Sequence, residues 1–156
     1  MLKIQIPGRE ILQIDNFIFD YNGTIATDGK ISESIKEALN ELSKHVNIYV
    51  ATADTYGNAR LECSKLNLKV ELLTNGETRK AKKEFVHQLN PLSTVCFGNG
   101  FNDEEMLSEC LLSIGVLGDE GIYAGLVNKC DIIVNSIENA LDLFIKPNRF
   151  IALLRD

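Results

Sequence analysis

The sequence lacks several features, and each absence excludes a class of protein. No apolar run approaches the roughly 20 residues of a membrane-spanning helix. The first residues also lack the apolar core of a secretory signal peptide, so we expect a cytoplasmic protein. Positive charge is scarce, since 16 lysines and arginines stand against 22 aspartates and glutamates, and the net charge is −6. This balance argues against nucleic acid or an anionic membrane as the main partner.

Paired cysteines and linker segments are absent as well. The four cysteines are scattered without C-x-x-C spacing, which excludes the usual zinc and dithiol signatures. No long Pro-, Gly- or Ser-rich segment, internal repeat or low-complexity stretch divides the chain. Residues 1–156 are therefore expected to form a single domain, which is long enough to bury a substantial core.

An alternation of apolar runs and amphipathic segments is present throughout the chain. A hairpin is predicted over residues 2–15, with its turn at Pro7-Gly8. Strands are predicted at residues 14–19, 46–51, 68–73, 94–97, 111–116 and 131–134. Helices are predicted at residues 32–44, 56–66, 78–89, 103–109, 121–126, 136–145 and 147–154. Strands that alternate with helices predict an α/β fold with a doubly wound, mainly parallel sheet covered on both faces.

The most informative stretch runs from Phe17 to Thr24, where an apolar segment ends abruptly at Asp20. Asp20 then stands at the carboxyl end of a strand, where ligands bind in open α/β sheets. Asn22-Gly23 tolerates positive φ and turns the chain, and the Thr24 hydroxyl can donate to a phosphate oxygen. An acid, a tight turn and a hydroxyl together are typical of a phosphate or metal site. An aspartate that caps its own turn would give the same pattern.

Two further strand ends and one helix should meet at the same edge of the sheet. Thr52 follows the second long strand, and the loop 98–103 (GNGFND) follows the strand after residue 94. This loop has two glycines for close backbone approach, two amides and a carboxylate. The basic stretch 79–83 opens a helix, and one lysine directed at the edge would balance the charge of a phosphate. The pattern alone leaves open which lysine does so: Lys80, Lys82 or Lys83.

These elements, in this order, resemble the motifs of the haloacid dehalogenase superfamily of aspartyl phosphotransferases. Asp20-Tyr21-Asn22-Gly23-Thr24 is similar to the D-K-T-G-T of the phosphorylation domain of P-type ATPases, and residues 98–103 are similar to their G-D-G-x-N-D. The spacing of Lys82, Val86 and Leu89 matches their K-x-x-x-V-x-x-L segment better than the other lysines do. The resemblance covers essentially the whole chain and implies the Rossmann-like fold of the superfamily.

The resemblance implies a Mg²⁺-dependent phosphatase in which Asp20 is the nucleophile that forms an aspartyl-phosphate. Thr52 and Lys82 would hold the phosphoryl oxygens, and Gly23 and Thr24 would shape the phosphate-binding loop. Oxygen donors suit Mg²⁺. The ligands would be Asp20, the backbone carbonyl of Asn22, Asn99 and Asp103, the last directly or through a water. The partner would be a phosphorylated substrate, either a small molecule or a macromolecule.

Two residues depart from the pattern of the superfamily. Asn22 stands where most of its phosphatases have the aspartate that protonates the leaving group, and such acid catalysis is worth about 10²–10⁴-fold. Asn99 stands where the family usually has a metal-binding carboxylate. We therefore expect weakened metal binding and slow turnover, with a preference for leaving groups that need no proton, such as aryl or acyl phosphates. Asp54 is expected to cap the following helix, and a substitute acid at this position is the alternative.

The segments that carry a cap domain in other members of the superfamily are short in this chain. We therefore expect a capless protein with an open site, which suits a bulky substrate, a homo-oligomer or low selectivity; the sequence does not choose among them. A non-catalytic phosphate- or metal-binding regulatory module of the same fold is the main alternative, favoured by both asparagines. A receiver-like domain phosphorylated on Asp20 is a poorer match, because Asp15-Asn16 precedes the same strand instead of an earlier one.

Overall fold

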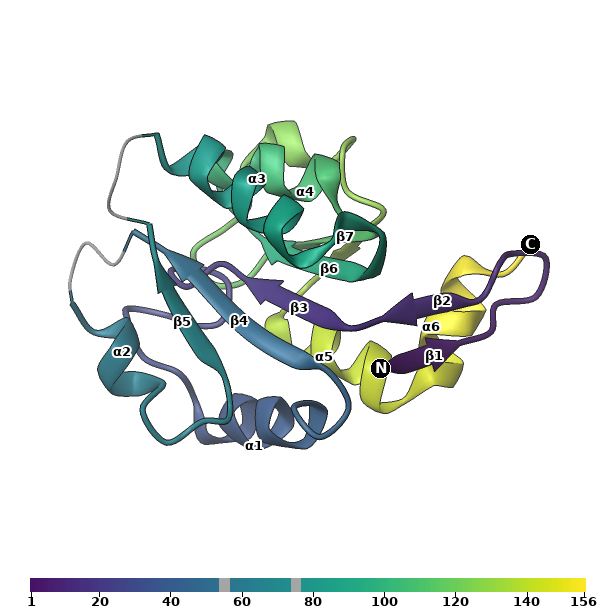
Figure 1. Cartoon of the computed structure of the whole chain (residues 1–156), viewed down its shortest axis with the longest axis horizontal. Coiled ribbons are helices and arrows are strands. Elements are labelled where there is room, and N and C mark those ends of the chain that lie inside the picture. The colour runs from purple at the N-terminus through teal and green to yellow at the C-terminus, as the bar shows by residue number, and fades with distance from the viewer. Residues whose placement is uncertain (54–56, 74–76) are drawn as a thin grey trace.

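The computed structural model describes residues 1–53, 57–73 and 77–156, and its centre is a sheet of six parallel strands (Figure 1). The strands are β3 (Asn16–Phe19), β4 (Asn47–Thr52), β5 (Lys69–Leu72), β6 (Thr94–Gly98), β7 (Leu112–Val116) and β8 (Ile132–Val134). Their spatial order is β5–β4–β3–β6–β7–β8. The chain winds outward from β3 to β5 and then returns to β6 on the other side of β3. The predicted doubly wound fold is therefore confirmed, and its switch point lies between β3 and β6.

Helices cover both faces of this sheet (Figure 1). The α-helices are α1 (Glu33–Leu42), α2 (Ala59–Glu62), α3 (Thr78–Leu89), α4 (Glu104–Glu109), α5 (Ile137–Ile145) and α6 (Pro147–Leu154). Helices α3 and α4 pack together on one face, and α1 and α5 pack together on the other. Within the described residues, none of these helices has the combination of length and apolarity that a bilayer crossing requires.

Strand β3 is buried on both sides because its residues alternate between the two layers of helices. Phe17 and Phe19 belong to the apolar core under α1 and α5, whereas Ile18 belongs to the core under α3 and α4. The Phe19 ring stacks on Phe97 with centroids 4.1 Å apart, and the Phe17 ring lies 4.7 Å from Phe144. These ring contacts join β3 to β6 and to α5. The strand that ends at Asp20 is therefore held rigidly.

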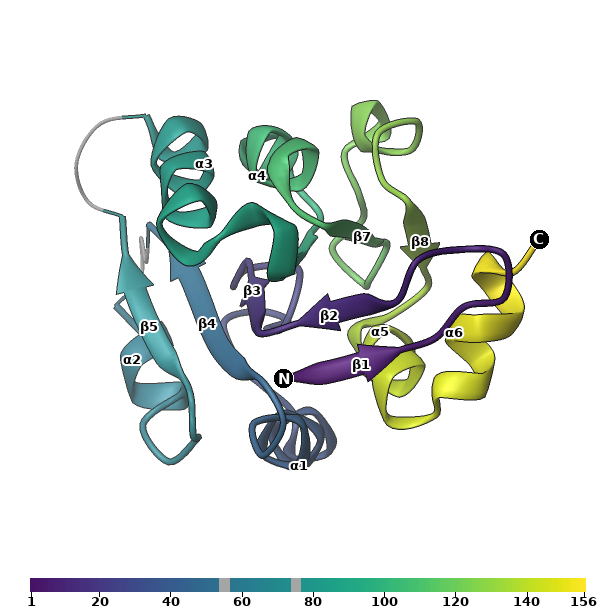
Figure 2. The ribbon, with the colours of Figure 1, turned by 45° about the vertical axis from the view of Figure 1, so that its right-hand side comes forward.

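The N-terminal hairpin is present as predicted, with β1 (Leu2–Ile4) antiparallel to β2 (Leu12–Ile14). It lies beside α6, as Figure 2 shows. Ile4 and Ile14 are buried in the same core as Phe150 of α6. Apolar side chains at the two ends of the chain therefore pack against each other inside one molecule.

Two predicted helices are much shorter than expected. The helix predicted over residues 56–66 is reduced to the four residues of α2, because Gly57 has a φ of 72°, outside the helical region, and Cys63 ends the helix. The predicted start at Tyr56 lies outside the described residues. The helix predicted over residues 121–126 is a short 3₁₀ turn, Ala124–Leu126, because Gly121 has a φ of 83°. Hydrophobic periodicity did not reveal either glycine's backbone conformation.

Candidate active site

Asp20 leaves the end of β3 at the switch point of the sheet, and its backbone N–H donates to the Phe97 carbonyl over 2.9 Å. The chain then turns through Gly23, which has a φ of 77°. A Cβ atom on Gly23 would lie 2.3 Å from Nδ2 of Asn99. Glycine is therefore required twice here, for its positive φ and for the close approach of this loop to the loop after β6.

Lys82 connects the two carboxylates of the site. Its ammonium donates to Oδ1 of Asp20 over 2.5 Å and to Oδ1 of Asp103 over 2.6 Å. The lysine comes from the second turn of α3, and its side chain is 0% exposed. A fully buried lysine is rare unless anionic groups surround it, and here two do. Of the three candidate lysines in the sequence, Lys82 is therefore the one that contacts Asp20.

The neighbouring lysines of α3 lie outside this cluster. Lys80 pairs with Glu77 over 2.8 Å, and Lys83 pairs with Glu109 over 2.8 Å. Both are solvent-accessible ion pairs on the helix surface, which contribute little to stability. The structure thus separates one buried lysine at the strand ends from two surface lysines.

Asp103 is held from all sides. Its Oδ2 accepts the backbone N–H groups of Asn99 and Gly100 over 3.0 and 2.9 Å, while Oδ1 accepts from Lys82. A Cβ atom on Gly98 would lie 2.6 Å from the side chain of Asp103, so the glycine makes room for this contact. The carboxylate is 0% exposed. Asp103 therefore closes the loop after β6 and fixes Lys82 in place.

A cavity of about 220 Å³ opens beside Asp20. Its walls are Asp20, Asn22, Thr52, Ala53, Asn99, Gly100 and Asn102. Thr52 ends β4 and is buried. The Thr24 hydroxyl lies behind this wall, 3.3 Å from Oδ2 of Asp20 and 3.2 Å from Oδ1 of Asn99. Every site residue that the sequence predicts is thus brought to one edge of the sheet. Asp54 lies outside the described residues.

Burial by itself shifts the pKa values of Asp20 and Lys82 in opposite directions, because it disfavours the charged form of each. Burial raises the pKa of the Asp20 carboxyl to about 6, and the nearby Asp103 carboxylate adds to this rise while Lys82 opposes it. For Lys82, burial by itself would lower the pKa of the ammonium, but the two carboxylates outweigh burial and raise it. Lys82 therefore keeps its proton, and Asp20 is the group of this cluster whose charge responds to pH near neutrality.

The oxygen donors at the cavity fit a small hard cation such as Mg²⁺. Asp20, Asn22 and Asn99 all line the same wall, and the Asn99 amide oxygen also accepts from the Thr24 hydroxyl. Mg²⁺ commonly keeps several waters and takes only one or two protein carboxylates, so this sparse donor set is compatible with it. Among the described residues, no group of three or more acidic, histidine or cysteine side chains is placed to hold a metal. Asp103 is fully enclosed and does not line the cavity, so a direct bond from its carboxylate to the metal would require this side chain to move.

Sequence reasoning missed a second set of residues beside the cavity. Oε1 of Glu120, from the loop after β7, accepts the backbone N–H of Asp28 over 2.9 Å. In the same loop the Gly121 carbonyl accepts from Nδ2 of Asn99 over 3.0 Å, and the Tyr123 N–H donates to the Asn99 carbonyl over 2.7 Å. The position of this loop at the carboxyl end of β7 was the available signal, but its residues match no motif of the family.

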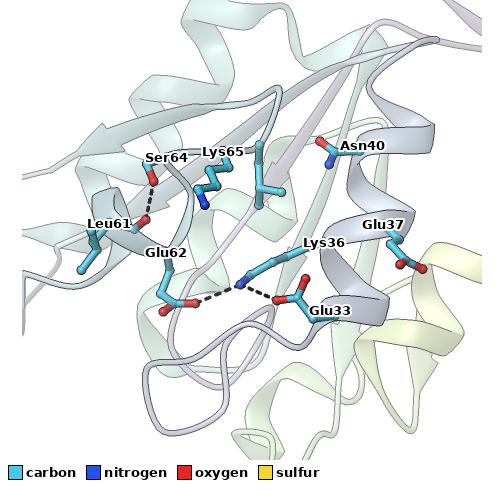
Figure 3. Close-up of a pocket in the computed structure, with 9 residues that line it drawn as sticks. Glu33, Lys36, Glu37, Asn40, Leu61, Glu62, Ser64 and Lys65 are labelled. Atoms are coloured by element: carbon cyan, nitrogen blue, oxygen red, sulfur yellow. Dashed lines mark hydrogen bonds and ion pairs between the residues drawn. The ribbon is translucent and has the colours of Figure 1, made fainter.

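A second hollow, of about 410 Å³, lies between α1 and α2 and shares no lining residue with the Asp20 cavity (Figure 3). Lys36 reaches across it, 3.0 Å from Glu33 and 3.5 Å from Glu62. The Ser64 hydroxyl donates to the backbone of Leu61 over 2.7 Å. The central cation of this hollow, Lys36, is thus paired with two carboxylates, and none of the residues of the predicted site lines it, which leaves the Asp20 cavity as the better candidate site.

Comparison with solved structures places this geometry in a known fold. The chain matches a cobalt-bound deoxy-D-mannose-octulosonate 8-phosphate phosphatase of Haemophilus influenzae with a TM-score of 0.72 and 15% identity, over 92% of this chain and 94% of that one. The Moraxella catarrhalis 3-deoxy-D-manno-octulosonate 8-phosphate phosphatase, solved with magnesium, phosphate and KDO, gives 0.71 and 15%, over 91% and 94%. An apo phosphoserine phosphatase gives 0.65 and 15%, over 84% and 98%.

Sequence comparison finds relatives in an archaeon. No family model matches the chain. The uncharacterized protein MJ0073 of Methanocaldococcus jannaschii is 38% identical over 93 residues, which are 57% of this chain and all of that protein. The uncharacterized protein MJ0072 of the same organism is 55% identical over 38 residues, 24% of this chain and 86% of that protein. The chain therefore belongs to the same family as MJ0073, and it has the fold of the haloacid dehalogenase superfamily that its motifs predicted.

Proposed function

We propose that this protein is a phosphohydrolase of the haloacid dehalogenase type, with Asp20 as its nucleophile. One observation carries the proposal: the buried Lys82 ammonium lies between Asp20 and Asp103, and Asp20 borders a cavity that Thr52 also lines. A positive charge buried at this point suits an anionic ligand beside Asp20. The similar solved structures include phosphatases of two kinds, which supports the same reaction class.

In the first step, a carboxylate oxygen of Asp20 attacks the phosphorus of a phosphate monoester. A bond forms from this oxygen to phosphorus, and the bond from phosphorus to the leaving oxygen breaks, which gives an aspartyl-phosphate and an alkoxide or phenoxide. Lys82 and the Thr52 hydroxyl would stabilise the phosphoryl oxygens. A rigid β3 holds the nucleophile in place, so little reorganisation is needed at the moment of attack.

In the second step, water attacks the phosphorus, the bond between Asp20 and phosphorus breaks, and inorganic phosphate leaves. Asn22 lines the cavity where the leaving oxygen departs, but its amide cannot donate a proton as a carboxylic acid does. The leaving oxygen must therefore take its proton from water. We expect slow turnover of alkyl esters and faster turnover of aryl and acyl phosphates, whose leaving groups are stable as anions.

Mg²⁺ is the cofactor that we propose for this site. Asp20, the Asn22 carbonyl and Asn99 would hold it, and Asp103 would contribute through a bound water. When bound, Mg²⁺ would supply positive charge that offsets the repulsion between the carboxylate and the phosphate. Asn99 brings an amide dipole instead of a negative charge, so we expect the affinity for Mg²⁺ to be reduced.

A non-catalytic phosphate- or metal-binding module is the second candidate function. Asn22 and Asn99 favour it, because both line the cavity where superfamily phosphatases have acids. The two functions differ in one measurable respect, since only the first consumes the ester.

Hydrolysis of para-nitrophenyl phosphate, with and without Mg²⁺, tests the proposed function. We expect Mg²⁺-dependent turnover in the wild type that falls by at least about 10³-fold in Asp20→Asn, because removal of a nucleophile is among the largest catalytic losses. Asn22→Asp should raise the turnover of an alkyl phosphate by up to about 10²-fold through restored acid catalysis. It should change the turnover of the aryl ester much less.

Mass spectrometry of the quenched wild-type reaction should show a phosphoryl adduct on the peptide that contains Asp20. Turnover that survives in Asp20→Asn would refute the proposed nucleophile. Absence of turnover in both the wild type and Asn22→Asp, with Mg²⁺ still bound, would favour the non-catalytic module.

A further inference from the structure

A larger cavity, of about 680 Å³, adjoins the Asp20 cavity and shares Asn22 with it. Its lining residues are Asn22, Asp28, Gly29, Asn58 and Glu120. They come from three separate parts of the chain: the loop after β3, the start of α2 and the loop after β7. Its volume is in the range of small-molecule binding sites. Since Asn22 belongs to both walls, a ligand whose phosphate lies beside Asp20 would extend into this second cavity.

Glu120 is an exposed residue whose carboxylate is held in this wall by one hydrogen bond and lies close to the turn after Asp20. Oε1 accepts the Asp28 N–H over 2.9 Å, and Asp28 is held at a φ of 51° by the turn that it forms with Gly29. Oε2 lies 3.1 Å from the position of a Cβ atom on Gly23. This oxygen is therefore directly beside the turn after Asp20.

The charges of this cavity have one sign. Asp28 and Glu120 are carboxylates, Asn22 and Asn58 are carboxamides, and no lysine, arginine or histidine is among the described lining residues. The cation of the active site, Lys82, lies buried on the other side of Asp20. A second anionic group on a substrate would be repelled here, whereas a cationic group would be attracted by two carboxylates and could donate to four oxygen-bearing side chains.

We propose that this larger cavity binds the leaving group of the substrate, and that the leaving group is an alcohol bearing an ammonium group. Glu120 and Asp28 are then the residues that determine specificity. The proposal rests on the proposed function, because it requires the phosphate to lie beside Asp20. It also predicts rejection of phosphate esters that carry a carboxylate on the leaving alcohol.

Three phosphate esters of similar size test the proposal: O-phosphoethanolamine, ethyl phosphate and phosphoglycolate, which end in an ammonium, a methyl and a carboxylate group. We expect kcat/KM to fall in that order, with at least a tenfold difference between the first and the last. Glu120→Gln should reduce this ratio by about tenfold, because the amide oxygen keeps the hydrogen bond to the Asp28 N–H but loses the charge. Asp119→Asn is the matched control, since it removes one charge from the adjacent exposed residue, which does not line the cavity.

The outcomes separate this proposal from the function on which it rests. Equal kcat/KM values for the three esters would overturn the leaving-group proposal, and so would equal effects of Glu120→Gln and Asp119→Asn. Hydrolysis of para-nitrophenyl phosphate in the same preparations would show that the proposed function still holds. If no ester is hydrolysed, calorimetric titration of the wild type with O-phosphoethanolamine and phosphoglycolate in Mg²⁺ decides the matter. At least tenfold tighter binding of the ammonium ester, lost in Glu120→Gln, would support the cavity's specificity, and equal or absent binding would overturn it.

Discussion

Asp20 and Asp103 are both buried carboxylates bound to the same ammonium, yet they are held very differently. Asp103 accepts three hydrogen bonds, one from Lys82 and two from backbone N–H groups, and is fully enclosed. Asp20 accepts from Lys82 and from the Tyr21 backbone, lies within reach of the Thr24 hydroxyl, and borders the cavity. The first is committed to holding the loop after β6. Asp20 can present an oxygen to the cavity, because the Thr24 hydroxyl beside its Oδ2 can turn to Asn99 instead.

This difference suggests that the two acids have separate roles, Asp103 in folding and Asp20 in the reaction. A fully enclosed carboxylate that is held by an ammonium and two backbone N–H groups cannot reach a substrate. A carboxylate that is desolvated but incompletely paired is less stable as an anion, and burial raises the pKa of Asp20 to about 6 accordingly. The expected result is that substitutions of Asp103 act on folding and substitutions of Asp20 act on turnover.

Loss of the shared cation should have the largest effect on the free energy of unfolding. Lys82→Met would leave two neighbouring buried carboxylates without a counter-cation, and breaking a buried ion pair in this way typically costs about 3–5 kcal/mol. Urea denaturation at pH 8 measures this loss. Lys80→Met is the control, because its ion pair with Glu77 is solvent-exposed and its urea midpoint should match that of the wild type. Equal midpoints for the two variants would show that Lys82 is not buried between the acids.

Substitution of each acid by asparagine should then change the free energy of unfolding by different amounts. In Asp103→Asn, the new NH₂ group must face either the Lys82 ammonium or two backbone N–H groups, so a donor meets a donor. We expect a loss of about 1–3 kcal/mol in the free energy of unfolding.

In Asp20→Asn the amide oxygen can face Lys82 and the NH₂ group can face the Thr24 hydroxyl, which already has a second acceptor in Asn99. This variant should be at least as stable as the wild type at pH 8. A greater loss in Asp20→Asn than in Asp103→Asn would invert the comparison and assign the structural role to Asp20.

The pH dependence of stability gives the smallest and most specific effect. The folded-state pKa of Asp20, about 6, lies above its ordinary value of 3.8. The protonated side chain therefore favours folding below pH 3.8, and this contribution is lost as the pH rises through about 6. Between pH 4 and pH 7, without metal, the wild type should lose of the order of 2 kcal/mol relative to Asp20→Asn. Thermal unfolding of both proteins across this range measures it, and parallel curves would contradict a raised pKa.

The sequence predicted those parts of the site that stand at strand ends. Asp20, Thr52 and the loop 98–103 each follow an apolar strand directly, and parallel topology brings such positions together whatever the intervening residues are. The preference for Lys82 came from its resemblance to a motif, since the charge pattern of residues 79–83 could not show which lysine is buried.

Glu120 and Asp28 were missed for a different reason. Their contact joins two loops 92 positions apart and depends on turns with positive φ at Asp28, Gly118 and Gly121. Such turns obey no hydrophobic period, so the sequence pattern contains no signal for where they direct a side chain. The same cause explains the shortened α2, where Gly57 interrupts an otherwise helical pattern.

The pairing of β3 with β6 has a consequence for synthesis of the chain. The two strands begin 78 positions apart, at Asn16 and Thr94, so one edge of β3 has no partner until β6 has been translated. Strand β3 has two phenylalanines and an isoleucine, and the unpaired backbone edge of such an apolar strand can pair with other chains. Closing so long a loop is also slow relative to local folding. The topology that assembles the cavity therefore leaves an aggregation-prone strand exposed in the nascent chain until β6 is made.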